Sequence, residues 1–345
     1  MTDQSKANAS MANVAEQANV SLATVDRVLN RRKGVKPRTA QKVLATALEL
    51  GFFSQEEFDS HHRDRPLNIA VLLPAGTNPY LRMLGEKVRA RAAKPSRDSA
   101  KLRCFFIESF DANALAAALR HHAHWADGIA FMAIDHPTVR AALEEVTAAG
   151  TRVVTIITDL PHPARSAYVG LENQMAGRTA GLLMGRFCRE PAGSVALVAG
   201  SRNYRAHSER EAGFMALLDE MFPTLQLVGL REGHDSAAEN YRHTLALIDQ
   251  TPDLVGVYNV GGASDGIARA LVERDRRDLV FIGHGLTPDT RRLLIDGTMD
   301  TVIDSDPESI LDTAIRLIEN PDHNITPYAV KMDVFLRENL PPMQL

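Results

Sequence analysis

Short β-rich runs alternate with helical stretches from Leu67 to the end of the chain, and this alternation restricts the possible folds more than any other feature of the sequence. Strands that alternate with helices form parallel sheets with helices on their faces, so the pattern predicts an α/β fold. The predicted strands are residues 68–73, 102–107, 128–133, 152–157, 194–199, 225–230, 254–259, 279–283 and 298–303. So many units favour two Rossmann-like parallel-sheet lobes, the first ending near Tyr168 and the second beginning near Gly170.

The bulk composition is that of a globular protein without a membrane segment. At 345 residues the chain exceeds what one hydrophobic core usually serves. Its N-terminus, MTDQSKANASMANV, lacks the apolar stretch of a secretory signal, and no apolar run reaches the length of a membrane span. Cys104 and Cys188 form neither a disulfide framework nor a metal-ligand spacing. We therefore expect a cytoplasmic protein with no membrane partner.

The distribution of charge, rather than its total, points to a partner. A net charge of −4 alone argues against nucleic acid. Between Val20 and Lys42, however, seven basic side chains stand against the single acid Asp26. A local excess of this kind suits contact with phosphates.

Three short helices are predicted in the same region. Apolar residues recur at helical spacing over residues 11–18, 22–30 and 37–50. Ser21 stands where it can cap the second helix, and Pro37 and Gly51 mark the start and end of the third. A helix, a tight turn and a second helix, braced by a third, form the helix-turn-helix that places one helix in the major groove of DNA.

The second helix supplies the predicted contacts with DNA. Arg27 matches the two acceptors of guanine, and Leu22 and Ala23 suit the methyl groups of thymine. Phosphate contacts are expected from the polar and basic side chains around it, namely Ser21, Asn30, Arg31, Arg32, Lys36, Arg38 and Thr39.

The segment NVAEQANVSLATVDRVLNRRKGVKPRTAQKVLATALELGF resembles, nearly end to end, the DNA-binding headpiece of the lactose-repressor (LacI/GalR) family. The resemblance implies that the chain is a sequence-specific transcriptional regulator. It also implies base reading by Leu22, Ala23 and Arg27. The positions that match backbone contacts are Ser10, Ser21, Asn30 and Thr39.

Three features depart from the family pattern. Asp26 stands where Ser is common, and an acid beside phosphates weakens binding unless a basic side chain neutralises it. Lys36 replaces the Ser that would cap the third helix. The segment after Gly51, FFSQEEFDSHHRDRP, lacks the expected hinge helix; it carries Glu56, Glu57 and Asp59, and has His61 near the place of the hinge Leu.

Polar residues follow several of the predicted strands. Because ligands of parallel sheets bind at the carboxyl ends of the strands, these residues are expected to line a cleft between the two lobes. They include Asn78, Tyr80, Asp135, Asp159, Arg202, Tyr204, Asn259 and His284. This mixture of aromatic, amide, carboxylate and guanidinium groups suits hydroxyl-rich ligands such as sugars and polyols.

The body also resembles the periplasmic-sugar-binding-like effector domain of the same family, over residues 67–336, in the phrases VGLENQMAGRTAGLLM, SRNYRAHSEREAGF, GVYNVGGASDGIARAL and FIGHGLTPDTRRLLIDG. The residues that this resemblance places at the effector are Arg210 and Asn259, followed by Asn78, Tyr80, Asp135 and Asp159. Gly285 stands where the family often has an acid, and Ser305 where Gln is frequent. The effector is then larger at this point, bears its own carboxylate, or binds through water.

These features predict a domain order. The ranges are a headpiece at 1–52, an atypical linker at 53–66, and an effector-binding and dimerisation domain at 67–345, whose lobes comprise about 67–168 with 304–330 and about 169–303 with 331–345. We expect a homodimer, or a tetramer, that binds an inverted-repeat operator in double-stranded DNA. A small sugar, polyol or sugar acid is expected to relieve repression.

Two other classes of protein stay open. An α/β enzyme acting on a sugar or nucleotide needs a positioned acid, base or nucleophile, and no such motif is legible. A transport-type binding protein would carry a secretory signal and would not need the basic headpiece. No metal or cofactor is expected, because His121 and His124 lack a third ligand and the loop at Gly261 has no Lys for phosphate.

Overall fold

The computed structural model describes residues 10–30, 32, 34–52, 66–94, 100–320 and 330–342. The chain forms two compact units, a small one of Met1–Leu67 with Ser96–Ala100 and a large one of Asn68–Pro95 with Lys101–Leu345. No helix within the described ranges is long and apolar enough to cross a membrane.

Three helices form the small unit, the headpiece, as predicted: α1 (Met11–Ala18), α2 (Leu22–Leu29) and α3 (Pro37–Glu49). Ser10 and Ser21 precede the first two helices, and each hydroxyl accepts a hydrogen bond from the backbone N–H three residues later. Asn19 ends α1 in the left-handed conformation, with φ of 52°. One valine from each helix is fully buried at the centre: Val14, Val25 and Val43.

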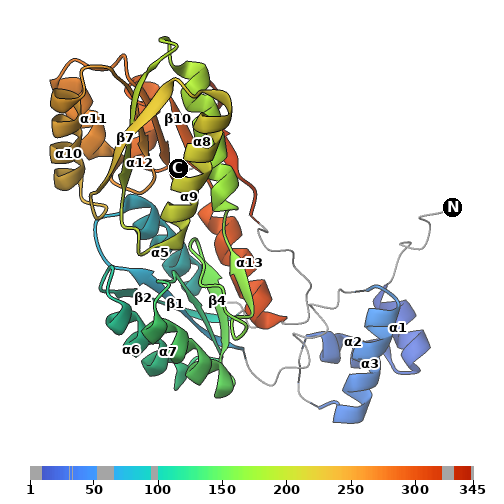
Figure 1. Ribbon diagram of the computed structural model, residues 1–345. Coiled ribbons are helices and arrows are strands. Elements are labelled where there is room, and N and C mark those ends of the chain that lie inside the picture. Colours follow the sequence, from blue (N-terminus) through green and yellow to red (C-terminus); the bar gives the residue numbers. More distant parts are fainter. Residues whose placement is uncertain are drawn as a thin grey trace. The chain divides into compact units, whose positions relative to one another are not determined.

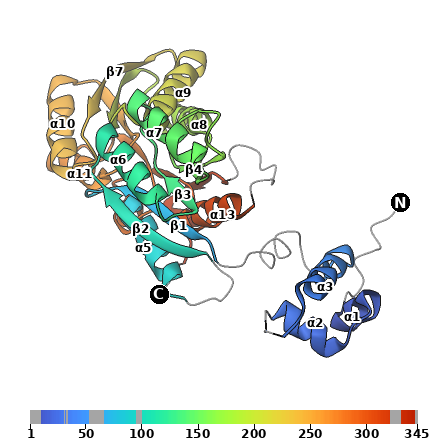
Figure 2. The same ribbon diagram turned by 90° about the horizontal axis from the view of Figure 1, so that it is seen from below.

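Five parallel strands form the sheet of the first lobe, in the order β2-β1-β3-β4-β5. They are β1 (Asn68–Pro74), β2 (Lys101–Ile107), β3 (Gly128–Phe131), β4 (Arg152–Ile156) and β5 (Ala167–Val169). One face is covered by α6 (Ala112–Ala123) and α7 (Pro137–Ala148), and the other by α5 (Pro79–Ala92) and α13 (Pro307–Glu319), as Figures 1 and 2 show. Ala70 and Leu72 of β1 lie in the core that includes α6 and α7, as the period of two in a strand requires.

Six strands form the sheet of the second lobe, in the order β11-β10-β9-β8-β6-β7, and β11 alone among them is antiparallel to its neighbour. They are β6 (Gly193–Ala199), β7 (Leu225–Glu232), β8 (Leu254–Asn259), β9 (Val280–His284), β10 (Thr301–Asp304) and β11 (Asp333–Phe335). Val195 and Leu197 of β6 pack with α8 (Asn173–Phe187) and α9 (Arg205–Met221). Ala196 and Val198 pack on the opposite face with α10 (Ala237–Gln250), α11 (Ser264–Glu273) and α12 (Pro288–Ile295). A short 3-10 helix, η1 (Arg337–Asn339), follows β11.

All nine predicted strands are present, and two further strands occur that the sequence pattern does not predict. These are β5 and β11, with three residues each, which is too short for a period of two to be recognised. β3 ends at Phe131, earlier than predicted. β10 begins at Thr301 rather than Thr298, because the N–H groups of Thr298 and Met299 both donate to the carbonyl of Leu293 and so close α12.

Helices α8 and α9, side by side in Figure 1, pack at short range because α8 presents a row of glycines. Gly177, Gly181 and Gly185 recur every four residues, on one face of the helix. A Cβ at Gly177 would lie 2.0 Å from the backbone carbonyl oxygen of Arg210, and a Cβ at Gly213 of α9 would lie 2.0 Å from a carbonyl oxygen of α8. This contact, the α8–α9 seam, fixes where the backbone of Arg210 lies relative to α8.

Candidate functional site

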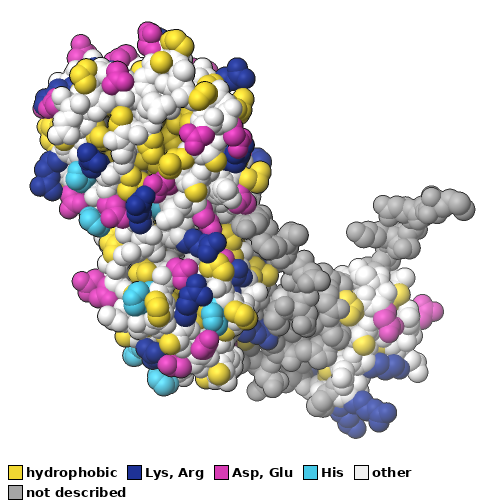
Figure 3. Space-filling view, in the orientation of Figure 1, with side chains coloured by type: hydrophobic (Ala, Val, Ile, Leu, Met, Phe, Trp, Pro, Cys, Tyr) yellow, Lys and Arg dark blue, Asp and Glu magenta, His cyan; other side chains and the backbone are white. Residues whose placement is uncertain are grey.

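The outward face of α2 carries the side chains predicted to read bases. Leu22 is 52% exposed on this face. Ala23 and Arg27 are exposed beside it, whereas Val25 and Val28 face the core. On the face of the headpiece shown in Figure 3, lysine and arginine side chains gather apart from the acidic ones.

Asp26, the acid in this basic region, is engaged by two of the predicted phosphate contacts. Asn30 Nδ2 donates to Asp26 Oδ1 at 2.7 Å, and Arg32 Nη1 donates to Asp26 Oδ2 at 2.9 Å. A carboxylate neutralised in this way repels phosphates less, so Asp26 is compatible with DNA binding.

The other predicted DNA contacts surround α2 in different settings. Ser10 and Ser21 are exposed and cap α1 and α2, while Lys36 precedes α3 without a side-chain cap. Arg38 is exposed and Thr39 half-buried at the start of α3. Four linker residues and one predicted phosphate contact lie outside the described residues: Glu56, Glu57, Asp59, His61 and Arg31.

A cavity lies between the two lobes of the body, at the carboxyl ends of both sheets. It encloses about 540 Å³ that protein atoms do not fill, part of it open to solvent. Met132, Ile157 and Leu171 contribute apolar wall. The polar residues that line it are Asn78, Tyr80, His207, Arg210, Asp235, His284, Asp304 and Ser305. Four of the predicted effector contacts are therefore together in one cavity: Asn78, Tyr80, Arg210 and His284.

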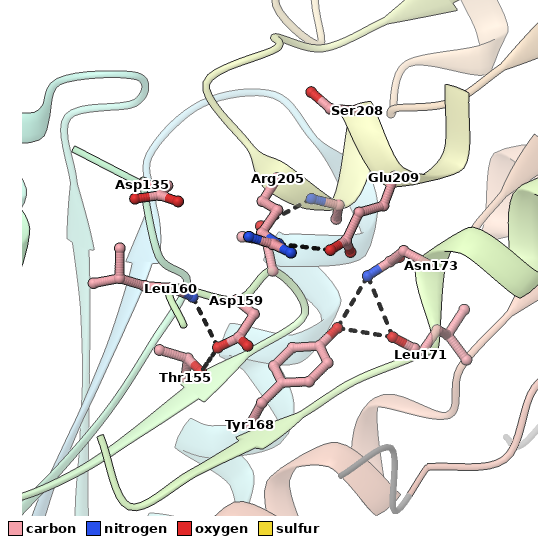
Figure 4. Close-up of polar contacts among 12 residues, drawn as sticks. Asp135, Thr155, Asp159, Leu160, Tyr168, Leu171, Asn173, Arg205, Ser208 and Glu209 are labelled. Carbon is pink, nitrogen blue, oxygen red and sulfur yellow. Dashed lines mark hydrogen bonds and ion pairs between the residues drawn. The ribbon is translucent and has the colours of Figure 1, made fainter. Parts of the chain in front are cut away.

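Arg210 is the cation of this cavity, and its side chain is held by neutral groups. It lies in the second turn of α9 and is 8% exposed. Its Nε donates to Asn173 Oδ1 at 2.8 Å, and its Nη1 donates to the carbonyl of Val260 at 3.0 Å. Burial lowers the pKa of the guanidinium below its ordinary value. Asn173 in turn donates from Nδ2 to the Tyr168 hydroxyl, a contact drawn in Figure 4.

Direct contacts join the lobes at the cavity. Asn78 Nδ2 of the first lobe donates to Asp235 Oδ2 of the second at 2.9 Å, and the Thr77 hydroxyl donates to the Asp235 carbonyl at 2.9 Å. The other carboxylate oxygen of Asp235 accepts from the N–H of Gly262 at 2.7 Å. These contacts hold the lobes in a closed arrangement.

Tyr80 fills the part of the cavity beside Gly285 and Ser305. Its hydroxyl donates to the Ser305 carbonyl at 2.7 Å and lies 3.1 Å from the Ser305 hydroxyl. A Cβ at Gly285 would lie 3.2 Å from the tyrosine ring. The acid and the Gln that the family often has at positions 285 and 305 would therefore compete with Tyr80 for this space.

Two histidines of the cavity have pKa values below the ordinary value of an imidazole. His284 Nε2 lies 2.7 Å from the Tyr258 hydroxyl, and burial lowers the pKa of His284 well below its ordinary value, with Arg210 adding to the effect. Nδ1 of His284 is buried and has no hydrogen-bond partner among the described residues. Nδ1 of His207 contacts the carbonyl of Ser201 at 2.8 Å, and burial lowers the pKa of His207 as well.

Asp304, at the end of β10, is the second carboxyl group of the cavity. It is 7% exposed, and one oxygen accepts from the N–H of Leu286 at 2.9 Å. Burial raises the pKa of Asp304 to about 7, against the lowering effect of its backbone hydrogen bonds. The side chain therefore changes charge close to neutral pH.

Five predicted effector contacts do not line this cavity. Asp135 binds Arg140 at 2.6 Å, and Arg202 binds Glu211 at 2.5 Å, so both are engaged in exposed ion pairs. Asp159 accepts from the Thr155 hydroxyl at 2.7 Å, as Figure 4 shows, and pairs with Arg165 at 2.8 Å. The remaining two are buried: Tyr204 lies in the core of the first lobe, and Asn259 donates to the carbonyl of Gly262 and to the hydroxyl of Ser264, each at 2.9 Å.

Four polar residues of the cavity were not among the predicted effector contacts: His207, Asp235, Asp304 and Ser305. His207 lies one turn before Arg210 on α9, a spacing that the sequence displays. Asp304 directly follows the predicted strand 298–303 and could have been found by that signal alone. Asp235 follows β7 in the left-handed conformation, with φ of 52°, and no sequence pattern brings it to Asn78.

Comparisons with known proteins give two matches to protein families on the one chain. Residues 10–55 match the family described as bacterial regulatory proteins, lacI family. Residues 69–320 match the family described as periplasmic binding protein domain. The search of curated proteins gives no match.

Solved structures similar to the body include binding proteins of transport systems and a regulator. GanP, a glucose-galactose binding protein from Geobacillus stearothermophilus, has a TM-score of 0.71 at 21% identity and covers 80% of this chain and 99% of its own. A solute binding protein from Burkholderia graminis, in complex with D-arabinose, has a TM-score of 0.72 at 20% identity over 80% and 98% of the two chains. A candidate LacI transcriptional regulator from Bacteroides fragilis has a TM-score of 0.70 at 17% identity over 79% and 98%. At these identities the likeness is one of fold.

Proposed function

Because the chain belongs to the lacI family of bacterial regulatory proteins and carries a periplasmic binding protein domain, we propose that this DNA-binding regulator is a repressor controlled by a small effector. The observation that carries the proposal is the presence, on one chain, of a helix with exposed Leu22, Ala23 and Arg27 and of a partly polar cavity around Arg210. The first can read DNA and the second can bind a metabolite. The chain is accordingly a regulator rather than an enzyme.

Operator recognition is assigned to α2 of two chains. Arg27 donates to guanine in the major groove, Leu22 and Ala23 contact thymine methyl groups, and the polar residues around them bind phosphates. One headpiece offers little contact area, so we place two of them, from a homodimer, on the halves of an inverted repeat. The protein acts in the cytoplasm, where its DNA is.

The effector is assigned to the cavity between the lobes and is a small sugar, polyol or sugar acid. Apolar wall beside amide, guanidinium, imidazole and carboxyl groups suits a hydroxyl-rich molecule. The sugar ligands of proteins with the same fold support this chemistry. An effector that prefers one degree of lobe closure shifts the population of chains able to bind operator, and we expect it to relieve repression.

Selection of bound fragments from a genomic library, by the intact protein at moderate salt, tests the DNA-binding half of the proposal. One sequence with inverted-repeat symmetry should be enriched. Arg27→Ala should lower the affinity for that sequence about 10- to 100-fold, with little change on random DNA, because a bidentate base contact supplies discrimination. Arg38→Ala, which removes a predicted phosphate contact, should weaken both and reduce the salt dependence. Weak binding without sequence preference would sink the proposal.

Thermal denaturation with sugars, polyols and sugar acids tests the effector half. A ligand that binds only the folded body raises its melting temperature. The same compound should then release the selected operator fragment. A compound that stabilises the body but leaves the affinity for the operator unchanged would contradict control by this cavity.

A further inference from the structure

Asp26 lies on the face of α2 that is assigned to base reading. Residues three and four positions apart are neighbours on a helix, so Asp26 lies beside Leu22 and Ala23 of the preceding turn. It directly precedes Arg27, and its side chain is 35% exposed. An acid at this place repels the phosphates that approach α2, whatever the sequence of the DNA.

Both oxygens of the Asp26 carboxylate accept hydrogen bonds from side chains at the end of α2 and just beyond it. Oδ1 accepts from Asn30 Nδ2 at 2.7 Å, and Oδ2 accepts from Arg32 Nη1 at 2.9 Å. The backbone also holds Arg32 in place, because its N–H donates to the carbonyl of Arg27 at 2.7 Å. The carboxylate therefore sets the direction of two donor side chains beside the base-reading face.

Arg32 keeps most of its donors although its charge is compensated. A guanidinium carries five N–H groups, of which the hydrogen bond to Asp26 uses one. The Arg32 side chain is 62% exposed. The Asp26–Arg32 ion pair can thus donate hydrogen bonds to DNA at close range. Because the pair has no net charge, it adds no long-range attraction to phosphates.

The turn after α2 is built closely around Arg27. Gly34 has a φ of 105°, and a Cβ at this position would lie 3.1 Å from Arg27 Nη1. Arg32, in the same turn, binds the Arg27 carbonyl through its backbone. The Asp26–Arg32 ion pair and the side chain assigned to guanine therefore belong to one local arrangement.

Binding to random DNA and binding to operator depend differently on such an ion pair. Affinity for random DNA comes from positive charges that release counterions from phosphates, so each uncompensated Lys or Arg strengthens it. Affinity for operator also depends on donors that point in the required direction. Specificity is the difference between the two affinities, and a compensated charge lowers the first while the donors for the second remain.

We propose that Asp26 is a specificity-determining residue of this regulator, because it cancels the charge of Arg32 and orients Arg32 and Asn30 beside the base readers. The inference rests on the proposed function, since it concerns the operator contacts of α2. Asp26 is a positioning residue that acts through its two partners. The Ser that is common at this position in the family would leave the charge of Arg32 uncompensated.

Asp26→Asn tests the inference, because it removes the charge and keeps the size of the side chain. Fluorescence anisotropy measures the affinity of the intact protein for the selected operator fragment and for a scrambled duplex of equal length, between about 50 and 200 mM salt. The variant should bind scrambled DNA roughly 5- to 30-fold more tightly than the wild type, with a log–log salt slope steeper by about 1 to 2 for a dimer. Its affinity for the operator should change less than about threefold, because the gain in attraction is offset by the loss of orientation.

Two further variants separate the role of this position from that of net charge. Glu16→Gln is the matched control, because Glu16 is an exposed acid on α1, and it should change the affinity for both duplexes by the same factor. Asp26→Asn combined with Arg32→Gln restores the net charge. Its affinity for scrambled DNA should return to within about twofold of the wild type.

The outcomes distinguish this inference from the proposed function. An equal change on both duplexes in Asp26→Asn, as in Glu16→Gln, would overturn the role of Asp26 and leave operator recognition standing. A wild type that binds operator and scrambled DNA with the same affinity would refute the proposed function instead.

Discussion

The headpiece and the cavity use polar side chains in opposite ways. On α2 the side chains assigned to recognition lie at the surface, and the hydrogen bonds around them are local: Asn30 and Arg32 reach an acid only four and six residues away. In the cavity the polar groups are buried or half-buried, and several of their partners are distant in sequence. Arg210 is held by residues 37 and 50 positions away, and Asn78 meets Asp235 across 157 positions.

The difference teaches where function is tied to stability. A surface residue can be exchanged at little cost to folding, because water replaces whatever it contacted. A buried polar group cannot, because its partners are left without hydrogen bonds. Substitutions in the headpiece should therefore separate DNA binding from stability, and substitutions in the body should not.

The largest effect is expected at the α8–α9 seam. Gly177→Val places methyl groups where the backbone of α9 already lies, so we expect the body to lose about 3 kcal/mol or more in free energy of unfolding and the response to effector to disappear. Calorimetric melting of the intact protein measures the loss. Gly297→Ala is the control, because nothing lies within 4 Å of the added Cβ and only its φ of 75° opposes the change. If Gly177→Val melted at a temperature no lower than Gly297→Ala, close packing at the α8–α9 seam would not be important for stability.

A smaller effect, dependent on pH, is expected at Asp304. Its folded pKa of about 7 exceeds that of an unfolded aspartate. As pH rises from 4 toward 7, the unfolded chain releases a proton that the folded chain retains, so the free energy of unfolding falls. Asp304→Asn lacks this titrating group. Its free energy of unfolding, measured by urea denaturation, should therefore rise relative to that of the wild type by roughly 2 kcal/mol between pH 5 and pH 8.

An aspartate with the opposite shift provides the control for this measurement. The exposed Asp249 has a lowered pKa because Arg274 donates a hydrogen bond to it. Asp249→Asn should therefore lose stability relative to the wild type as pH rises toward 4, and the difference should stay constant between pH 5 and pH 8. A difference between Asp304→Asn and the wild type that also stayed constant between pH 5 and pH 8 would show that Asp304 is not a carboxyl group raised by burial.

The smallest effect on folding is expected at Leu22. Because this side chain is 52% exposed, Leu22→Ala should change the free energy of unfolding by less than about 0.5 kcal/mol. Its affinity for the selected operator should nevertheless fall, as fluorescence anisotropy would show. Val25→Ala, fully buried on the same helix, should cost roughly 2 kcal/mol in stability. Equal loss of stability in the two variants would break the contrast between surface and buried side chains on which the comparison rests.

Most helices and strands could be predicted from the sequence, because the patterns that indicate them are local. Caps at Ser10 and Ser21, a proline at the start of α3 and apolar periodicity located the three helices of the headpiece. The same periodicity located nine strands of the body. What escaped were the three-residue strands β5 and β11, whose existence depends on pairing with β4 and β10 rather than on their own residues.

The cavity could be predicted from the sequence only in part, because several of its contacts join residues that are distant in sequence. The expectation that polar residues at strand ends line the cavity was correct for Asn78, Tyr80 and His284. The topology of the sheets alone determines where these strand ends lie. That rule cannot tell a residue turned into the cavity from one bound by a neighbour. Asn259 follows the rule and yet shapes its own loop, whereas Asp235 enters the cavity through a left-handed backbone conformation.

The α8–α9 seam has a consequence for how this protein can acquire new effectors. With no room for a Cβ between the two backbones, neither helix can shift to suit a ligand of another shape, and the guanidinium of Arg210 remains a fixed anchor. At the loops that carry Gly285 and Ser305, by contrast, Tyr80 makes its contacts through its side chain. Adaptation to other metabolites should therefore proceed by exchanges at that rim, with the anchor inherited unchanged.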